Sequence, residues 1–338
     1  MDILNNHSLK AFNTFGIDAK CRYYVAVHSE TELRAALADR QFDNLPRLIL
    51  GGGSNVLLTA DFPGLVIHVN IIGKRVVARD NAATYVEAAA GENWHEFVSW
   101  TLEQGWAGLE NLSLIPGSVG AAPMQNIGAY GVELIDTFHS LAALDSATGE
   151  TRIFDRQACR FAYRDSVFKR ELKGRVAITG VTFRLPHDSP LHLDYGEVRA
   201  ELAKLNINTP TARDVSHAVI NIRRRKLPDP AQIGNAGSFF KNPIIIEAEF
   251  RRLQHSHPSL PHYAARPGHV KIPAGWLIEQ TGWKGKHLGR AGVHAQHALV
   301  LVNLGGANGA EIRTLAQAIQ HAVHEQFSIE LEPEPIII

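Results

Sequence analysis

The stretch that most constrains this chain is residues 115–131, IPGSVGAAPMQNIGAYG. Glycine, alanine and serine fill about half of its positions, and it contains no lysine, aspartate or glutamate. Neither a regular helix nor a strand is expected from this composition, because glycine opens positive φ and leaves the backbone without side-chain contacts. Glycine also lets peptide N–H groups approach a flat or anionic ligand closely. A solvated loop would carry more charge, so we interpret the stretch as a long loop buried against a ligand.

Length and composition exclude several protein classes. A chain of 338 residues exceeds the usual size of one hydrophobic core, which predicts two or three domains. Its 34 basic and 34 acidic residues cancel, which argues against a nucleic-acid-binding protein. Cys21 and Cys159 lie far apart without CxxC spacing, and we expect two buried thiols in a reducing compartment.

Targeting and metal signals are weak in this sequence. The N-terminus lacks a basic segment followed by an apolar one, and no apolar run is long enough to span a bilayer. We therefore expect a cytoplasmic protein with no membrane partner. Seventeen histidines include several close pairs, but no carboxylate or cysteine pattern supports them, so no metal site is predicted.

A second glycine-rich segment is residues 47–59, RLILGGGSNVLLT, in which an apolar strand leads into three glycines and a second β-prone run. The dinucleotide fingerprint G-x-G-x-x-G is excluded, because Val56 stands where the third glycine belongs and no helix follows. A strand, turn and strand can still present the amides of residues 51–55 to a pyrophosphate. A plain tight hairpin is the alternative for this segment alone.

Local patterns predict both helices and strands. Amphipathic periodicity favours helices over residues 92–104, 211–226, 274–281 and 308–327, with Thr211/Asp214 and Asn308/Glu311 as N-terminal capping pairs. Short β-prone runs predict strands at residues 66–69, 75–77, 85–88, 141–144, 176–185, 298–302 and 329–331.

Three polar positions stand out in the remaining segments. Arg164 lies next to Asp165 in FAYRDSVFK, where a surface ion pair is the simplest alternative to a functional role. Ser238 follows a glycine and precedes two phenylalanines, without the G-x-S-x-G elbow of a hydrolase. Its hydroxyl could bind a ligand or deliver a proton, or simply satisfy a turn. Lys226 ends a run of four cations that could contact phosphate or remain solvated.

Seven motifs taken in order make the chain similar to the UDP-N-acetylenolpyruvoylglucosamine reductase family, known as MurB. They are LGGGSNVL, ENLSLIPGSVGAAPMQNIGAYGVEL, YRDSVFK, KLPDP, GNAGSFFKNP, AGWLIEQ and LEPE. Each motif alone is weak, but their order is specific, and the resemblance extends from residue 13 to Glu334. A loop that carries Tyr195 resembles the type I branch of the family.

The resemblance implies an FAD-binding fold of the PCMH or vanillyl-alcohol-oxidase type, built from two α+β subdomains, plus a C-terminal α+β substrate-binding domain. The corresponding ranges are residues 1–70, residues 71–206 with the Tyr195 loop, and residues 207–338. It also implies noncovalent FAD. The residues expected to hold the flavin are Gly51, Gly52, Gly53, Ser54, Asn55, Pro116, Gly117, Ser118, Gly120, Asn126, Gly128, Tyr130 and Gly131.

The activity implied by the resemblance is that of a UDP-N-acetylmuramate dehydrogenase. Such an enzyme reduces UDP-N-acetylglucosamine enolpyruvate with NADPH, through FAD, in peptidoglycan precursor synthesis, and so serves cell wall biogenesis, cell shape and cell division. Ser238 matches the general acid, and Arg164 and Glu334 match the residues that polarise the enolpyruvyl carboxylate. Tyr195, Lys226 and Asn242 match contacts to the nucleotide diphosphate. The oligomeric state stays open, and a monomer is compatible with the sequence.

Two other classes of protein share part of this pattern. A different flavin oxidase of the same fold would often attach its flavin through histidine or cysteine, and neither glycine loop contains such a residue. A non-catalytic UDP-sugar-binding protein would need the same pocket without Ser238, Arg164 and Glu334, and all three are present. The colour of the purified protein separates these classes.

Overall fold

The structure is a computed structural model that describes residues 1–338. It divides into two compact units. Unit 1 comprises Met1–His7, Cys21–Gly53 and Pro63–Arg225, and unit 2 comprises Ser8–Lys20, Ser54–Phe62 and Lys226–Ile338. The three ranges expected from the sequence, 1–70, 71–206 and 207–338, divide the chain at other positions than these two units. They stay a prediction. No helix combines the length and the apolar character needed to cross a membrane.

The first sheet of unit 1 has four strands, and helix α1 (Glu30–Ala38) packs on it through a core that includes Leu33, Val25 and Leu65. Its strand order is β1 (Leu4–Ser8), β2 (Lys20–Val27), β5 (Phe62–Val69) and β3 (Arg47–Leu50). Strands β3 and β5 are parallel. Strand β3 therefore does not pair with the β-prone run after the glycines, and the hairpin alternative is wrong.

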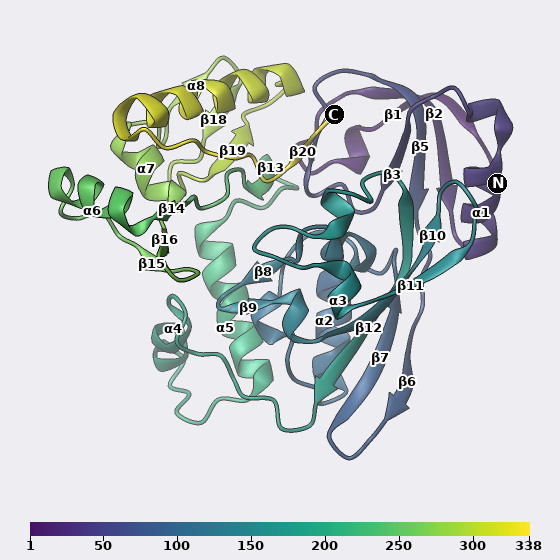
Figure 1. Cartoon of the computed structure of the whole chain (residues 1–338), viewed down its shortest axis with the longest axis horizontal. Helices are drawn as coiled ribbons and strands as arrows, with labels where there is room; N and C mark the ends of the chain where they lie inside the picture. The colour runs from purple at the N-terminus through teal and green to yellow at the C-terminus, as the bar shows by residue number, and fades with distance from the viewer. The chain divides into compact units, whose positions relative to one another are not determined.

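The second sheet of unit 1 is antiparallel and has five strands, which lie side by side in Figure 1. Their order is β11 (Thr151–Asp155), β10 (Phe138–Asp145), β12 (Val176–Pro186), β7 (Ala83–Ala89) and β6 (Lys74–Arg79). Helix α2 (Trp94–Glu103) buries Trp94 and Phe97 in the core that these strands share. Both aromatic rings contact Phe183 of β12. The predicted helix and strands of this region are confirmed.

Unit 1 also contains smaller elements. They are α3 (Arg156–Cys159), α4 (Val198–Lys204), α5 (Ala212–Lys226), and the short 3-10 helices η2 (Arg40–Phe42), η3 (Glu110–Leu112), η5 (Leu134–Asp136) and η6 (Val167–Lys169). The predicted Thr211/Asp214 pair forms, because the Asp214 carboxylate accepts the Thr211 N–H at 2.8 Å. Cys21 and Cys159 are both buried, as expected, and burial raises the pKa of the Cys159 thiol to about 12.

Unit 2 contains a four-stranded and a three-stranded sheet. The first has the order β13 (Gly234–Ser238), β19 (Val300–Asn303), β18 (Ala291–Val293) and β17 (His287–Leu288). The second has the order β14 (Ile244–Ile246), β16 (His269–Lys271) and β15 (Tyr263–Ala264). Its other elements are η1 (Lys10–Phe12), α6 (Glu247–Ser256), α7 (Ala274–Gln280) and α8 (Gly309–Phe327).

Helix α8 confirms the predicted start and buried face. Asn308 and Glu311 form a capping box, and the buried side includes Ile312, Leu315 and Phe327. The strand predicted at residues 329–331 is wrong. Ile329 and Leu331 bury their side chains in the alternating way that mimics a strand, but their backbone joins no sheet. A short strand comes later, where β20 (Ile336–Ile337) pairs in parallel with β4 (Val56–Leu57).

Candidate active site

The loop at residues 115–131 is more regular than its composition suggests. Val119–Gln125 forms the 3-10 helix η4, and β8 (Gly128–Ala129) pairs with β9 (Val132–Glu133) in a small hairpin. The expectation of neither helix nor strand was therefore wrong. Asn126, between η4 and β8, and Tyr130, between β8 and β9, have φ 46° and 50°. These left-handed residues turn the chain, so the regular segments stay short.

The glycine turn after β3 packs directly against this loop. A Cβ atom added at Gly52 would lie 2.7 Å from the Cα of Gly117, and one added at Gly51 would collide with the Ser118 hydroxyl. The Ser118 hydroxyl is buried and has no hydrogen-bond partner. A ligand can complete the hydrogen bonds of a buried, unsatisfied hydroxyl that lies among closely approaching peptide groups. These residues fit the flavin expected from the sequence.

Main-chain hydrogen bonds fix the start of this loop. Gly117 accepts the Trp94 N–H at 3.0 Å, and the Val119 N–H donates to the Glu92 carbonyl at 2.9 Å. The Gly120 N–H donates to the Ala90 carbonyl at 2.9 Å. An added Cβ at Gly120 would lie only 2.9 Å from the Cα of Ala90, so only glycine allows this approach. The segment is thus pre-formed by the end of β7 and the start of α2.

The FAYRDSVFK segment supports the same loop from another side. The Arg164 guanidinium donates to the Gly128 carbonyl at 2.7 Å. The Ser166 hydroxyl donates to the Met124 carbonyl at 2.6 Å. Asp165, the partner expected for a simple surface pair, forms an ion pair with Arg170 at 3.2 Å. The structure therefore brings Arg164 together with the predicted flavin residues.

Asn126 uses its carboxamide within the protein. Its –NH2 group donates to a Glu133 carboxylate oxygen at 2.7 Å, and its oxygen accepts the Ile135 N–H at 3.0 Å. Because these bonds hold the turn after η4 in place, we expect Asn126 to shape the loop. Its predicted flavin contact stays a prediction.

The Tyr195 loop also meets the glycine-rich loop. A Cβ added at Gly131 would lie 3.1 Å from the Cβ of Tyr195, which is a tight contact. Gly131 also has φ +83°, so both the space and the backbone conformation favour glycine here. Burial raises the pKa of the neighbouring Tyr130 phenol. Tyr195 itself is half exposed.

Two residues that hold the loop were not singled out in the sequence. His95 Nδ1 accepts the Leu114 N–H at 3.1 Å, and Arg223 Nε donates to the Leu114 carbonyl at 3.3 Å. Leu114 has φ 58°, an unusual conformation for leucine, directly before residue 115. Burial, and then Arg224 and Arg223, lower the pKa of His95, which favours the neutral imidazole that this bond requires. No local sequence signal marks His95, and Arg223 is indistinguishable within a run of cations.

In unit 2 the structure brings Ser238 and Glu334 together. The Phe239 carbonyl, one residue after Ser238, accepts the Glu334 N–H at 2.8 Å. The side chains of Phe239 and Phe240 are fully buried. Asn55 donates from its carboxamide to the Glu334 carbonyl at 3.3 Å. Three segments distant in the sequence therefore meet at Glu334.

Lys226 and Asn242 also lie in unit 2. The Asn242 carboxamide oxygen accepts the N–H of Ala274, the first residue of α7, at 2.9 Å. A contact of Asn242 with phosphate would therefore use its –NH2 group. Lys226 lies close enough to His297 to influence it electrostatically. Burial lowers the pKa of the His297 imidazole, and the Lys226 charge lowers it further.

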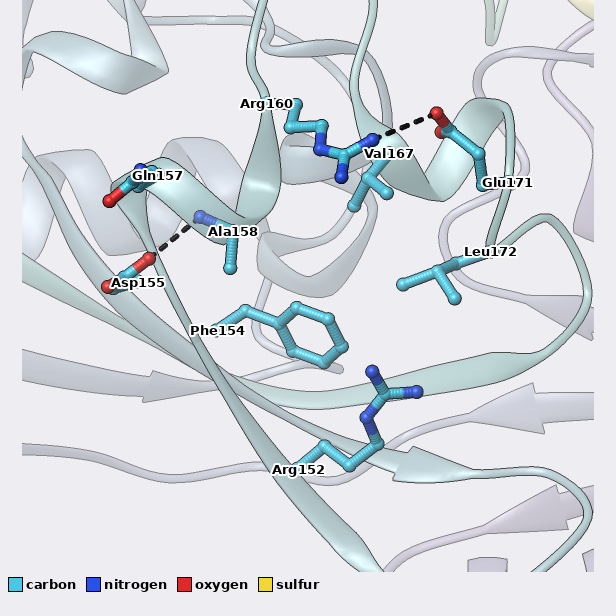
Figure 2. A pocket seen from close by; sticks show the side chains of 9 residues that line it. All are labelled: Arg152, Phe154, Asp155, Gln157, Ala158, Arg160, Val167, Glu171 and Leu172. Carbon is cyan, nitrogen blue, oxygen red and sulfur yellow. Dashed lines mark hydrogen bonds and ion pairs between the residues drawn. The ribbon is translucent and has the colours of Figure 1, made fainter.

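A depression of about 590 Å³ lies elsewhere on unit 1, around α3 and η6. Figure 2 shows Phe154 at its centre, with Arg152 on one side and the Arg160–Glu171 ion pair, at 3.2 Å, on the other. None of the predicted catalytic, flavin or substrate residues lines it. Arg152 already lies over the Phe154 ring, and Arg160 is already paired with Glu171. We therefore assign this depression no role in the reaction.

Comparisons with known proteins point to one family. Residues 21–155 match the family model described as FAD binding domain, and residues 229–338 match that of the UDP-N-acetylenolpyruvoylglucosamine reductase C-terminal domain. A UDP-N-acetylenolpyruvoylglucosamine reductase of Paraburkholderia xenovorans is 54% identical over 337 residues, covering 99% of this chain and 97% of the relative.

Two solved structures share the fold. The crystal structure of UDP-N-acetylenolpyruvylglucosamine reductase (MurB) from Thermus caldophilus aligns with a TM-score of 0.67 and 23% identity, covering 99% of this chain and 98% of that one. The crystal structure of p-cresol methylhydroxylase with substrate bound aligns with a TM-score of 0.50 and 9% identity, covering 98% and 84%. The expected PCMH-type fold with an additional C-terminal domain is confirmed.

Proposed function

This chain belongs to the UDP-N-acetylenolpyruvoylglucosamine reductase family, and we propose that it reduces UDP-N-acetylglucosamine enolpyruvate to UDP-N-acetylmuramate, with FAD as cofactor and NADPH as reductant. The structural observation that carries the proposal is the cradle of Gly51, Gly52 and Gly117 around the buried Ser118 hydroxyl. Such a cradle admits peptide N–H groups to a flavin nucleotide without side-chain interference.

The chemistry that FAD supplies when bound is transfer of a hydride from NADPH to the substrate. Addition of hydride to an enol ether carbon builds negative charge on the conjugated carboxylate, so a fixed guanidinium stabilises the transition state more than the ground state. We assign this role to Arg164. To Glu334 we assign what the resemblance implies, polarisation of the same carboxylate and stabilisation of the enol-like intermediate. The arginine is held by its bond to Gly128, which reduces the reorganisation needed during the reaction.

Ser238 is assigned the protonation of the neighbouring carbon. Serine is a very weak acid in water, so it can act as a proton donor only where water is excluded and the acceptor is strongly basic. The fully buried rings of Phe239 and Phe240 directly follow Ser238 in the chain and support a dry surrounding. The Glu334 backbone, bonded to Phe239, lies beside this segment.

NADPH and the UDP-sugar are proposed to use one pocket in turn. The chain has no dinucleotide fingerprint of its own, and both ligands must place a reacting carbon against the same flavin face. Tyr195, Lys226 and Asn242 are assigned to the diphosphate of whichever ligand is bound. This arrangement predicts double-displacement kinetics with inhibition by excess UDP-sugar.

The test begins with the purified protein. It should be yellow, release free FAD on denaturation, and give parallel lines in steady-state plots when both substrates are varied. Flavin that stays attached after denaturation would favour the covalent flavin oxidase. Flavin bound without turnover would favour a UDP-sugar-binding protein, and a protein that takes up no FAD would refute the flavin assignment. Intersecting lines, or a complex with both ligands, would refute the shared pocket.

We also propose a cellular context for this activity. A supply of UDP-N-acetylmuramate for peptidoglycan synthesis would place the protein in the cytoplasm and link it to cell shape and cell division. The function of the family supports this context. Depletion of the protein in a bacterial host should therefore deplete UDP-N-acetylmuramate before cells lose their shape.

A further inference from the structure

Glu334 is held through both of its peptide groups. Its N–H donates to the Phe239 carbonyl at 2.8 Å, and its carbonyl accepts from the Asn55 carboxamide at 3.3 Å. Phe239 follows Ser238, and Asn55 follows the glycine turn that starts at Gly51. The backbone of Glu334 is therefore tied to two segments to which catalytic and flavin-binding roles are assigned.

The residues on either side of Glu334 continue this arrangement. Before it, Pro333 forms a β-bridge with Phe240. After it, the Ile336 N–H donates to the Asn55 carbonyl and the Ile338 N–H to the Leu57 carbonyl, each at 2.9 Å. Residues 332–334 thus run beside residues 239–241, residues 334–338 run beside residues 55–59, and Glu334 contacts both segments.

The contact beyond β20 reinforces the ladder. The Ile338 carbonyl accepts both the Thr59 N–H at 2.8 Å and the Thr59 hydroxyl at 2.7 Å. A strand of two residues has few hydrogen bonds of its own, so these end contacts largely determine whether it stays paired. Loss of one ladder bond should therefore loosen the segment that directly follows Glu334.

We propose that the β4/β20 ladder, with Asn55, is a positioning element that sets the place of the Glu334 carboxylate for the substrate half-reaction. The inference rests on the proposed role of Glu334. Reacting groups must be held close to their productive geometry, and a displacement of about 1 Å can slow a reaction by about 10²-fold. A ladder anchored on both sides of the residue restricts the backbone in the way that this requirement demands.

The alternation of the ladder provides a matched pair of variants. The Ile336 N–H donates to Asn55 and the Ile338 N–H to Leu57, and the peptide N–H of Ile337, between them, points away from β4. Ile336→Pro removes a donor to Asn55. Ile337→Pro introduces the same ring one residue later without removing a bond to β4, and the Ile337 side chain is already exposed.

The holoenzyme variants should be compared by rapid mixing in each half-reaction. Ile336→Pro is expected to slow oxidation of the reduced enzyme by UDP-N-acetylglucosamine enolpyruvate by about 10²-fold, with flavin reduction by NADPH and the half-saturating substrate concentration little changed. Ile337→Pro should leave both half-reactions near those of the wild type. Equal effects of the two prolines, or equal slowing of both half-reactions, would overturn the proposal.

A double-mutant cycle tests whether the ladder acts through Glu334. If it does, Ile336→Pro should add little to the loss already caused by Glu334→Gln, whereas additive losses would overturn the proposal. Should Ile336→Pro fail to retain FAD, Thr59→Val removes one end contact without changing the side-chain size much. It should slow the same half-reaction to a smaller extent, and an unchanged rate would count against the ladder.

Failure of the proposed function would look different. If Glu334→Gln alone leaves the substrate half-reaction unchanged, the role of Glu334 is refuted. If wild-type enzyme reduced by NADPH does not react with the UDP-sugar at all, the proposed activity is refuted. A wild-type rate that depends on Glu334 but not on Ile336 refutes only the positioning role.

Discussion

The approach of Gly52 to Gly117 allows a quantitative test of the flavin cradle. In Gly52→Ala the new methyl carbon would lie 2.7 Å from the Gly117 Cα and 3.0 Å from its carbonyl carbon. Carbon atoms in contact normally lie about 3.5–4.0 Å apart. Because both obstructing atoms belong to the backbone, no side-chain rotation relieves the overlap, and the turn and the loop must separate by nearly 1 Å.

The energetic consequence follows from overpacking. An extra methyl group in a well-packed site typically costs about 1–3 kcal/mol, which corresponds to roughly 5- to 150-fold in an equilibrium constant. Since FAD is proposed to bind where these two segments meet, the dissociation constant of FAD should rise within this range. The overall fold should survive, because Gly52 lies at an exposed turn.

Gly180→Ala is the matched control. It introduces the same methyl group in unit 1, but the nearest atom, the Ala88 carbonyl oxygen, is 3.5 Å away, an ordinary contact. Apo-protein of each variant should be titrated with FAD while flavin fluorescence is followed. Wild-type affinity in Gly52→Ala would refute the cradle, and an equal loss in Gly180→Ala would show that the effect is a general loss of packing.

Ser238→Ala should slow substrate reduction by roughly 10²–10⁴-fold and leave flavin reduction by NADPH nearly intact, whereas equal losses in rapid mixing would make Ser238 structural. Lys226→Ala should weaken both NADPH and the UDP-sugar in equilibrium titrations, and loss of one alone would separate their diphosphate sites. The His95 imidazole accepts the Leu114 N–H only when it is neutral, and the folded protein lowers its pKa. The stabilisation of the loop by this hydrogen bond is therefore complete at pH values above the ordinary His pKa of 6.5, and it declines as the pH falls below that value. FAD release should therefore accelerate on acidification, less so in His95→Gln, and a pH response shared by both would refute this origin. Asn308→Ala should lower the free energy of unfolding by about 1 kcal/mol in denaturant titrations, because it removes the α8 cap, and an unchanged midpoint would contradict the capping role.

Features that depend on neighbouring residues were predictable from the sequence. The starts of α5 and α8 follow from the pairs Thr211/Asp214 and Asn308/Glu311, since a cap and its partner lie three residues apart. The missing third glycine at Val56 excluded a Rossmann site for the same local reason. The ordered motifs indicated the family, and the comparisons confirm it.

Pairing between distant segments was decided only by the tertiary structure. Strand β4 has two residues, too few to show a periodic pattern, and its partner β20 lies at the other end of the chain. Buried alternation at Ile329 and Leu331 therefore suggested a strand in the wrong place. Asn55 and Glu334 are 279 residues apart, and neither carries a local signal of the other. Composition predicts which residues approach a ligand, but folding alone determines which backbone groups hold them there, because those hydrogen bonds join groups with no sequence proximity.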